Sequence, residues 1–238
     1  IRSRLGARGF AGGIKYCEDG SVHPIQLLQL IRTRLPCGVL ILENQEVQRV
    51  EEASGKKIIL TDRSTVEATI VVIATNGYSP LLHPFFVNKI FPTRGQILCT
   101  EAVAPFMEGP CYANFVLDYF RQLPTGEVII GGFRQLQKDA EKGYSDEVSE
   151  VIQNALSEFL RKHLPLLSSA RVTHRWTGVM GFSADGQPLV GSLPNDPSVY
   201  FCGGFTGHGM GLAFHAGKVL TDCVYGRTIP DFISARRF

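Results

Sequence analysis

Several short motifs that mark enzyme classes are missing from this sequence of 238 residues. It contains no G-x-S-x-G, no H-E-x-x-H and no glycine loop followed by Lys-Ser/Thr, and its six histidines are dispersed. These absences exclude a nucleophile elbow, a zinc-peptidase helix and a nucleoside-triphosphate loop. A true G-x-G-x-x-G is also lacking, so the sequence has no complete dinucleotide fingerprint of its own.

Clustered charge, long apolar runs and paired cysteines are missing too. The formal net charge is only +2 and the basic residues are scattered, so nucleic acid is not an expected partner. No apolar run reaches the roughly 20 residues of a membrane span. The six cysteines include no C-x-x-C pair, and most lie within apolar runs. We therefore predict reduced, packed cysteines, no metal site and a cytoplasmic location.

What is present is typical of a globular α/β chain with 44% hydrophobic residues. Apolar periodicity and turn residues predict helices over 23–35, 145–164 and 212–225, the first with a buried stripe of Leu27, Leu28, Ile31 and Leu35. The same signals predict strands over 11–19, 38–42, 47–52, 57–61, 66–75, 95–101, 112–122, 127–134, 187–191 and 199–202. Helix, apolar strand, small meander and second apolar strand in this order suit one half of a nucleotide-binding sheet.

The sequence is organised around Val199–Gly211, read VYFCGGFTGHGMG. A short strand, a glycine-rich turn and a helix follow one another, which presents free backbone N–H groups and a helix N-terminus to an anionic or electron-rich ligand. By itself this pattern fits a tight strand-to-helix crossover equally well.

Four ordered signatures carry a resemblance to a known family. They are GGIKYCEDGSVHPIQLL (Gly12–Leu28), VVIATNGYSPLL (Val71–Leu82), PTRGQIL (Pro92–Leu98) and the series W-x-G, D-G-x-P-L-V-G and G-x-x-G-H-G between Trp176 and Gly209. Together they resemble the C-terminal portion of the D-amino-acid oxidase superfamily of FAD-dependent oxidoreductases, which includes glycine, sarcosine and γ-glutamylputrescine oxidases.

The resemblance implies a fold and a division into domains. It implies part of a Rossmann-like FAD-binding sheet, formed by residues 21–82 and 184–226, without the N-terminal βαβ unit. Residues 1–20 and 83–183 are expected to form an antiparallel-sheet substrate domain with helices. Residues 227–238 are expected to be a tail on the surface.

The resemblance also implies which residues contact a non-covalently bound FAD. Val47 is expected beside the adenine, and Ala74, Thr75 and Asn76 beside the pyrophosphate and ribityl chain. The remaining expected contacts are Gly178, Gly204, Phe205, Thr206, Gly207, His208, Gly209 and Met210. For His208 two roles stay open: a polar contact to the flavin pyrimidine edge, or a structural hydrogen bond to a neighbouring carbonyl.

Met180 bears on the substrate, because amino-acid oxidases of the family typically have a carboxylate-binding arginine there. A thioether cannot hold a carboxylate, so the resemblance implies an amine or N-substituted amine. Oxidation of its C–N bond would pass a hydride to flavin, with O2 as the acceptor giving H2O2. Arg121 and Trp176 are further candidates on the substrate side, although Trp176 is interpreted first as a core residue. Gly178 stands at or near the family's flavin-linking cysteine, which disfavours a covalent flavin.

The sequence begins at Ile1 and lacks the family's strand and glycine fingerprint. We expect either a portion of a full-length oxidase, inactive when isolated, or a natural short chain that acts as a non-catalytic subunit without flavin. In both cases a missing N-terminal segment or a partner chain is expected to cover an apolar sheet edge.

Overall fold

The computed structural model describes residues 1–115 and 117–238, which form two compact units. Unit 1 consists of Ile1–Ser21 and Arg94–Val179, and unit 2 of Val22–Thr93 and Met180–Phe238. Two long strands, β5 (Ile90–Thr100) and β9 (Val172–Ser183), contain boundaries between the units. Each unit has its own hydrophobic core, so the two are described separately.

Unit 1 is built on an antiparallel sheet in the order β6-β7-β8-β5-β9, with β6 (Cys111–Ala113), β7 (Asp118–Gln122) and β8 (Val128–Gly131). The single strand predicted over 112–122 is wrong: it is a hairpin of β6 and β7. Asn114 and Phe115 adopt positive φ angles and turn the chain there, and Val116 lies outside the described residues. The short elements of this unit are α1 (Arg2–Leu5), η3 (Arg134–Gln137) and η4 (Pro165–Leu167).

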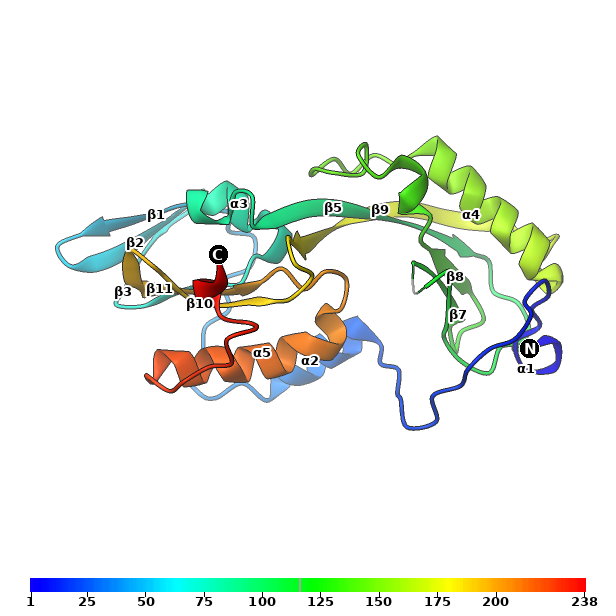
Figure 1. The fold of residues 1–238 in the computed structure, drawn as a ribbon, viewed down its shortest axis with the longest axis horizontal. Helices are drawn as coiled ribbons and strands as arrows, with labels where there is room; N and C mark the ends of the chain where they lie inside the picture. The colour runs from blue at the N-terminus through cyan, green and yellow to red at the C-terminus, as the bar shows by residue number, and fades with distance from the viewer. Residues whose placement is uncertain (116) are drawn as a thin grey trace. The chain divides into compact units, whose positions relative to one another are not determined.

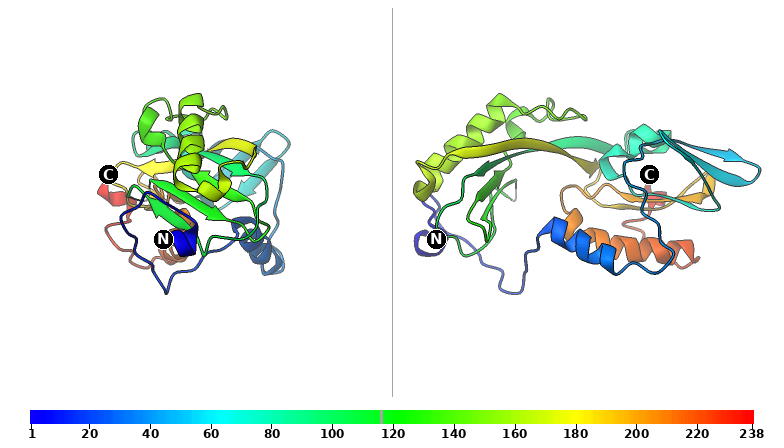
Figure 2. Two further views of the ribbon diagram at one scale, coloured as in Figure 1. Left: turned by 90° about the vertical axis from the view of Figure 1, so that its right-hand side faces the viewer. Right: turned by 180° about the vertical axis from the view of Figure 1, so that it is seen from behind.

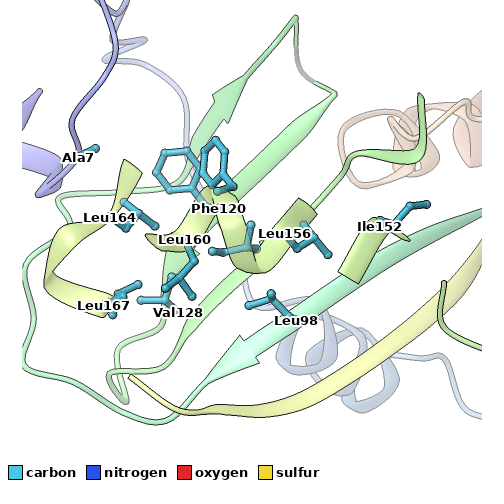
Figure 3. Packing of buried hydrophobic residues seen from close by; sticks show 11 residues of the cluster. Ala7, Leu98, Phe120, Val128, Ile152, Leu156, Leu160, Leu164 and Leu167 are labelled. Atoms are coloured by element: carbon cyan, nitrogen blue, oxygen red, sulfur yellow. The ribbon is translucent and has the colours of Figure 1, made fainter. Parts of the chain in front are cut away.

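The core of unit 1 lies between this sheet and α4 (Glu150–His163). Figure 3 shows Leu156, Leu160 and Leu164 packed against Phe120 and Val128 of the sheet. The helix begins five residues later than the predicted Ser145, because Ser149 is the residue whose hydroxyl accepts the N–H of Ile152. Ser145 instead accepts the N–H of Glu147 in the preceding loop. The pattern predicted the helix correctly and placed its start too early.

Unit 2 contains a sheet in the order β10-β11-β4, made of β10 (Leu189–Leu193), β11 (Asp196–Gly203) and β4 (Val71–Ile73). β10 and β11 are antiparallel, whereas β11 and β4 are parallel. One face packs against α5 (Gly209–Val224) through Val190, Cys202 and Val219. On the other face Phe86 and Phe201 pack edge to face, next to α3 (Ser79–Leu82), η1 (Asn76–Tyr78) and η2 (Pro84–Phe86). Figure 1 and the right-hand view of Figure 2 show α5 and α3 on opposite faces.

A second sheet of unit 2 is the meander β1 (Val47–Ala53), β2 (Lys56–Thr61) and β3 (Thr65–Ala68). The strand predicted over 66–75 is wrong, because its two halves are β3 and β4 in different sheets. The buried Lys57 ties the meander to the β10–β11 turn, since its Nζ lies 2.6 Å from Glu52 Oε2 and 2.6 Å from Asp196 Oδ2. These hydrogen bonds raise the pKa of Lys57, so the ammonium stays charged although it is buried.

The first part of unit 2 differs from the prediction. α2 (Pro24–Thr33) begins as expected at His23-Pro24, but none of its residues is buried. Leu28 is 61% exposed, and Leu40 in the predicted strand 38–42 is 82% exposed and has no strand geometry. The apolar residues are present, but none of those in α2 is buried in the described part of the chain. No helix in the described part of the chain has the length and apolar character needed to cross a membrane.

The end of the chain also differs from the prediction. Residues 227–238 are not simply a surface tail: Ile233 and Ala235 are buried, and Ser234 bridges to Val190 of β10. The short helix η5 (Ala235–Arg237) follows, and Arg237 pairs with Asp185 at 2.6 Å. The difference arises because Ile233 and Ala235 are apolar and bury their side chains, which fixes this segment against β10.

Candidate functional site

Segments at the ends of three strands of unit 2 meet at Asn76, the first residue of η1, which follows β4 after Ala74 and Thr75. Its side-chain Oδ1 accepts a hydrogen bond from the backbone N–H of Gly204 at 2.9 Å. A Cβ atom built on Gly181, near the end of β9, would lie 2.4 Å from the same Oδ1. A Cβ on Gly203, the last residue of β11, would lie 3.2 Å from Asn76 Cα. Glycine is therefore required at Gly181 for this close approach, and Asn76 joins the three segments.

The turn after β11 is fixed by hydrogen bonds to the end of β9. The N–H of Thr206 donates to the carbonyl of Gly181 at 2.8 Å, and the N–H of Ser183 donates to Thr206 Oγ1 at 3.2 Å. Gly204, Thr206 and Gly207 adopt positive φ angles of 71°, 52° and 82°. Glycine adopts a positive φ angle easily, which suits positions 204 and 207. At Thr206 the hydrogen bonds to Gly181 and Ser183 hold the backbone in this conformation. The turn is thus a defined shape.

The turn ends in the N-terminus of α5, which carries no side-chain cap. His208 is the N-cap residue, but its side chain does not bond the first turn. The N–H groups of Gly209 and Met210 belong to that first turn, where no intrahelical acceptor exists. Met210 is 62% exposed, and a Cβ on Gly207 would meet open space. The helix dipole and these bare donors favour an electron-rich group at this end.

His208 makes the structural hydrogen bond that was one of its two predicted roles. Its Nδ1 lies 2.9 Å from the carbonyl oxygen of Thr206. Because a carbonyl only accepts, Nδ1 carries the hydrogen, and Nε2 is the nitrogen available to a ligand. Phe205, the next predicted residue, pairs with Phe182 in an isolated bridge. Behind the turn, burial raises the pKa of the Cys202 thiol to about 11, so this thiol is protonated and is no nucleophile.

The other predicted residues divide between the two units. Ala74 and Thr75 are exposed beside Asn76, and Thr75 Oγ1 lies 3.0 Å from Ser79 Oγ. Val47 is the first residue of β1, in the meander sheet. Met180 is partly buried on the unit 2 part of β9. The unit 1 candidates are Trp176, which is 38% exposed, Gly178 on the same strand, and Arg121 on β7. The predicted core position for Trp176 is therefore wrong.

The sequence prediction missed Gly181 and Gly203. Each belongs to one of the quoted glycine-containing stretches, but neither spacing nor composition shows which glycine touches Asn76. The contact joins residues about 100 positions apart, so only the folded chain shows it.

The donor set suits the edge of a planar, electron-rich ring. It consists of backbone N–H groups and an imidazole nitrogen, without a charged side chain between Gly203 and Gly211. A flavin fits this description: its N1–C2=O edge is polar, and glycine lets its ring approach the backbone.

A sequence model of the family described as "DAO: FAD dependent oxidoreductase" matches residues 1–223. The chain belongs to this family. FAD is therefore the cofactor of its family, and the sequence-based family assignment is confirmed.

Individual relatives agree with the family. The chain is 28% identical to the "Probable oxidoreductase OrdL" of Rhizobium meliloti over 99% of this chain and 57% of the relative. It is 22% identical to the "Gamma-glutamylputrescine oxidoreductase" of Escherichia coli over 95% of this chain and 53% of the relative. The chain thus spans about half the length of the curated relatives it matches.

Solved structures show the same fold. Glycine oxidase from Geobacillus kaustophilus superposes with a TM-score of 0.68 at 20% identity, covering 81% of this chain and 51% of that one. L-proline dehydrogenase from P. horikoshii gives 0.68 at 22% identity, over 80% of this chain and 52% of the other. The mixed α/β fold predicted from the sequence is confirmed.

Proposed function

We propose that this chain supplies the flavin-edge and substrate portion of an FAD-dependent enzyme that oxidises the C–N bond of an amine or N-substituted amino acid. The junction of Asn76, Gly181 and Gly204 carries the proposal. It holds the bare turn and the N-terminus of α5 in a fixed geometry beside the end of β4. Electrostatic stabilisation needs donors that are already in place before charge develops.

FAD, when bound, supplies the acceptor for the hydride that leaves the carbon beside the amine nitrogen. The N–H groups of Gly207, Gly209 and Met210 are proposed to donate to its N1–C2=O edge, where negative charge gathers on reduction, whereas the N–H of His208 already donates to the carbonyl of Phe205. His208 would add Nε2 on the same side, and Phe205 and Thr206 would hold the turn. Gly178 offers no thiol, so we propose non-covalent binding, and O2 is the proposed final acceptor.

Met180 and the printed names of the relatives support the substrate class. Its thioether has no charge with which to bind the α-carboxylate of an ordinary amino acid. Relatives of this chain are named for γ-glutamylputrescine, sarcosine and glycine, which all contain an amine nitrogen. We therefore propose an amine or N-substituted amine, oxidised at the carbon next to nitrogen.

The remaining FAD contacts are proposed to need a further polypeptide segment. Val47, Ala74 and Thr75 would contact the adenosine and phosphate portions, and that segment would pair with β4. Val72 on β4 is 48% exposed, and the apolar faces of α2 and residues 39–42 are exposed as well. An N-terminal segment of the same protein or a partner chain would cover these surfaces and complete the cofactor site.

Flavin binding and turnover test the proposal. The purified chain, with a family N-terminal segment added, is titrated with FAD, and quenching of flavin fluorescence is followed for the wild type and for Gly207→Val, which places a β-branched side chain in the turn. We expect the variant to bind at least tenfold more weakly, whereas Gly55→Val, also at positive φ but in the distant β1–β2 turn, is the control. Peroxide released from amines by the FAD-loaded protein tests the chemistry.

The exposed apolar surfaces favour one alternative, a non-catalytic module of the family that binds another polypeptide and no flavin. A colourless protein whose fluorescence titration shows no FAD binding, also after a family N-terminal segment is added, would support the alternative and contradict the proposed enzyme.

A further inference from the structure

His83 lies between two short helices of unit 2 and fixes the start of the second. It follows α3 and is the N-cap residue of η2, where its Nδ1 accepts the backbone N–H of Phe85 at 3.1 Å. Its own N–H donates to the carbonyl of Ser79 in α3 at 3.1 Å. The imidazole meets the buried Phe86 ring edge to face, with centroids 6.2 Å apart. His83 therefore connects both helices to the core of unit 2.

The hydrogen bond from Phe85 determines which form of the imidazole can occupy this position. Because a backbone N–H only donates, Nδ1 carries no hydrogen, and the hydrogen of the neutral ring is on Nε2. A protonated imidazole has hydrogens on both nitrogens and has no acceptor left for the Phe85 N–H. Protonation therefore removes the side-chain cap of η2, whose first N–H groups have no acceptor within the helix.

His83 also lines a small cavity that holds charged side chains from other elements. The cavity has a volume of about 70 Å³, and its charged lining residues are Glu51 and Glu52 of β1, Lys57 of β2 and Asp196 of β11. The other residues around it are apolar. Lys57 pairs with both Glu52 and Asp196 at 2.6 Å, so these two carboxylates already have a cationic partner. Burial lowers the pKa of His83, and the negative charge of Asp196 offsets only part of this effect.

Ser79 links His83 to the candidate site. It is buried, and its Oγ lies 3.0 Å from the Oγ1 of Thr75, the residue before Asn76. The short helices η1, α3 and η2 therefore form one run from Asn76 to Phe86, and His83 caps its last helix. Lys89 is the charged residue that follows this run, and its Nζ lies 4.5 Å from the centroid of the Phe85 ring.

We propose that His83 is an acid-sensitive latch: protonation of its Nδ1 releases the cap of η2 and loosens residues 75–87, including the backbone around Asn76. The pKa of His83 in the folded chain lies below its ordinary value of 6.5. The stabilisation by His83 is therefore complete well above pH 6.5 and decreases as the pH falls below that value. The inference rests on the proposed function only for one consequence, weaker FAD binding in acid.

Hydrogen–deuterium exchange measured by mass spectrometry tests the latch at low protein concentration. Exchange of a peptide covering residues 83–88 is followed from about pH 8 to about pH 5 and corrected for the intrinsic rate. We expect its protection factor to fall roughly two- to tenfold, the effect of one lost hydrogen bond, with a midpoint below pH 6.5. The helix η4 is the internal control, because it also begins with proline but has no side-chain cap, and its protection should stay constant.

Variants of His83 separate the cap from the charge. His83→Asn keeps a short side-chain acceptor at the N-cap and does not titrate, so its protection should be high over the whole pH range. His83→Ala has no acceptor, so its protection should be low throughout. His23→Asn is the matched control, because His23 is an exposed N-cap residue whose Nδ1 accepts the N–H of Gln26 at 3.5 Å. This variant should keep the wild-type response of residues 83–88.

Constant protection of residues 83–88 in the wild type, a midpoint at or above pH 6.5, or an unchanged fall in His83→Asn would overturn the latch. If His83→Asn loses its folded circular dichroism, the wild-type midpoint and the comparison with η4 decide. None of these readouts uses flavin. An acid response in a protein that never binds FAD would refute only the proposed enzyme, whereas constant protection in a protein that binds FAD would refute only this inference.

Discussion

Asn76 shows how one side chain defines the candidate site. It has a positive φ angle of 48°, which asparagine tolerates better than most residues, and its amide oxygen satisfies the N–H of the buried Gly204. The sequence pointed to Asn76 through the family resemblance, because it follows an apolar run. No local sequence pattern could predict the hydrogen bond between Asn76 and Gly204, because the two residues are 128 positions apart.

Replacing this residue tests its structural contribution. Asn76→Ala leaves the Gly204 N–H without its acceptor, so we expect unit 2 to lose about 1–3 kcal/mol of unfolding free energy. Asn88→Ala is the matched control, since Asn88 also has a positive φ angle, 64°, in an exposed turn. Urea unfolding followed by signals from unit 2 measures both. Equal losses would show that only the backbone conformation matters.

Replacement by alanine is expected to affect the unfolding free energy differently at two glycines of β9. In Gly181→Ala the new Cβ would lie 2.8 Å from the backbone nitrogen of Gly77 and 2.4 Å from Asn76 Oδ1, so we expect a loss of roughly 1–3 kcal/mol. A Cβ on Gly178 meets nothing within 4 Å, so Gly178→Ala should leave the unfolding free energy within about 0.5 kcal/mol. Chemical unfolding compares the two. A stable Gly181→Ala protein would contradict the close approach at Asn76.

At the scale of elements, periodicity predicted the buried face of α4 and failed for α2, none of whose residues is buried in the described chain. The α4 pattern predicted a buried stripe that the structure contains, with Leu156 fully buried. The α2 pattern predicted an equally clear stripe, yet Ile31 is 40% exposed. Apolar periodicity predicts which face of a helix is hydrophobic, but it does not show what buries that face.

The buried stripe of α4 gives a direct stability test. Leu156→Ala is expected to cost about 2–5 kcal/mol, because it removes apolar contacts and leaves a cavity below Phe120 and Val128. Val151→Ala, on the same helix but 48% exposed, should change the unfolding free energy by less than about 1 kcal/mol. Thermal and urea unfolding of unit 1 signals provide the comparison. If both variants lost a similar amount of unfolding free energy, the assignment of Leu156 to the buried face and Val151 to the exposed face of α4 would be wrong.

The C-terminal segment should respond to acid through Asp185. The hydrogen bond from Arg237 lowers the pKa of Asp185 to about 2, below its ordinary value of 3.8. Since the folded pKa is depressed, the stabilisation is present above about pH 4 and is lost as the pH falls toward 2. The pair is partly exposed, so we expect at most about 1 kcal/mol. Asp185→Asn should differ from the wild type at pH 6 and match it near pH 2 in chemical unfolding; a constant difference would contradict the pairing.

On the scale of the whole molecule, each unit has a buried core, and unit 2 also leaves large apolar side chains of α2, residues 39–42 and α5 exposed. Leu28, Leu40 and Phe214 of unit 2 are 61%, 82% and 85% exposed. The relatives are about twice as long as the stretch they share with this chain. These observations explain why the fold class was predictable while the packing of residues 22–42 was not.

The open surface predicts how the isolated chain behaves. We expect it to bind a hydrophobic dye and to associate as its concentration rises, because large apolar side chains exposed in this number favour association. Leu28→Glu and Leu40→Glu should each reduce dye fluorescence and association without lowering the unfolding free energy by more than about 0.5 kcal/mol, since neither side chain is packed. Leu166→Glu, 59% exposed in unit 1, is the matched control and should leave association unchanged.

Addition of a separately expressed family N-terminal segment extends this test to the proposed cofactor site. If that segment covers α2 and the edge of β4, it should suppress dye binding and association in the wild type and tighten FAD binding. The Leu28→Glu and Leu40→Glu variants should resist this rescue, because a buried carboxylate in the new interface carries an uncompensated charge. Dye fluorescence, sedimentation and FAD quenching are measured on the same mixtures. A wild-type chain that stays monomeric, binds no dye and binds FAD no more tightly after the segment is added would contradict the proposed covering of the sheet edge. It would also contradict the proposal that the segment completes the FAD site.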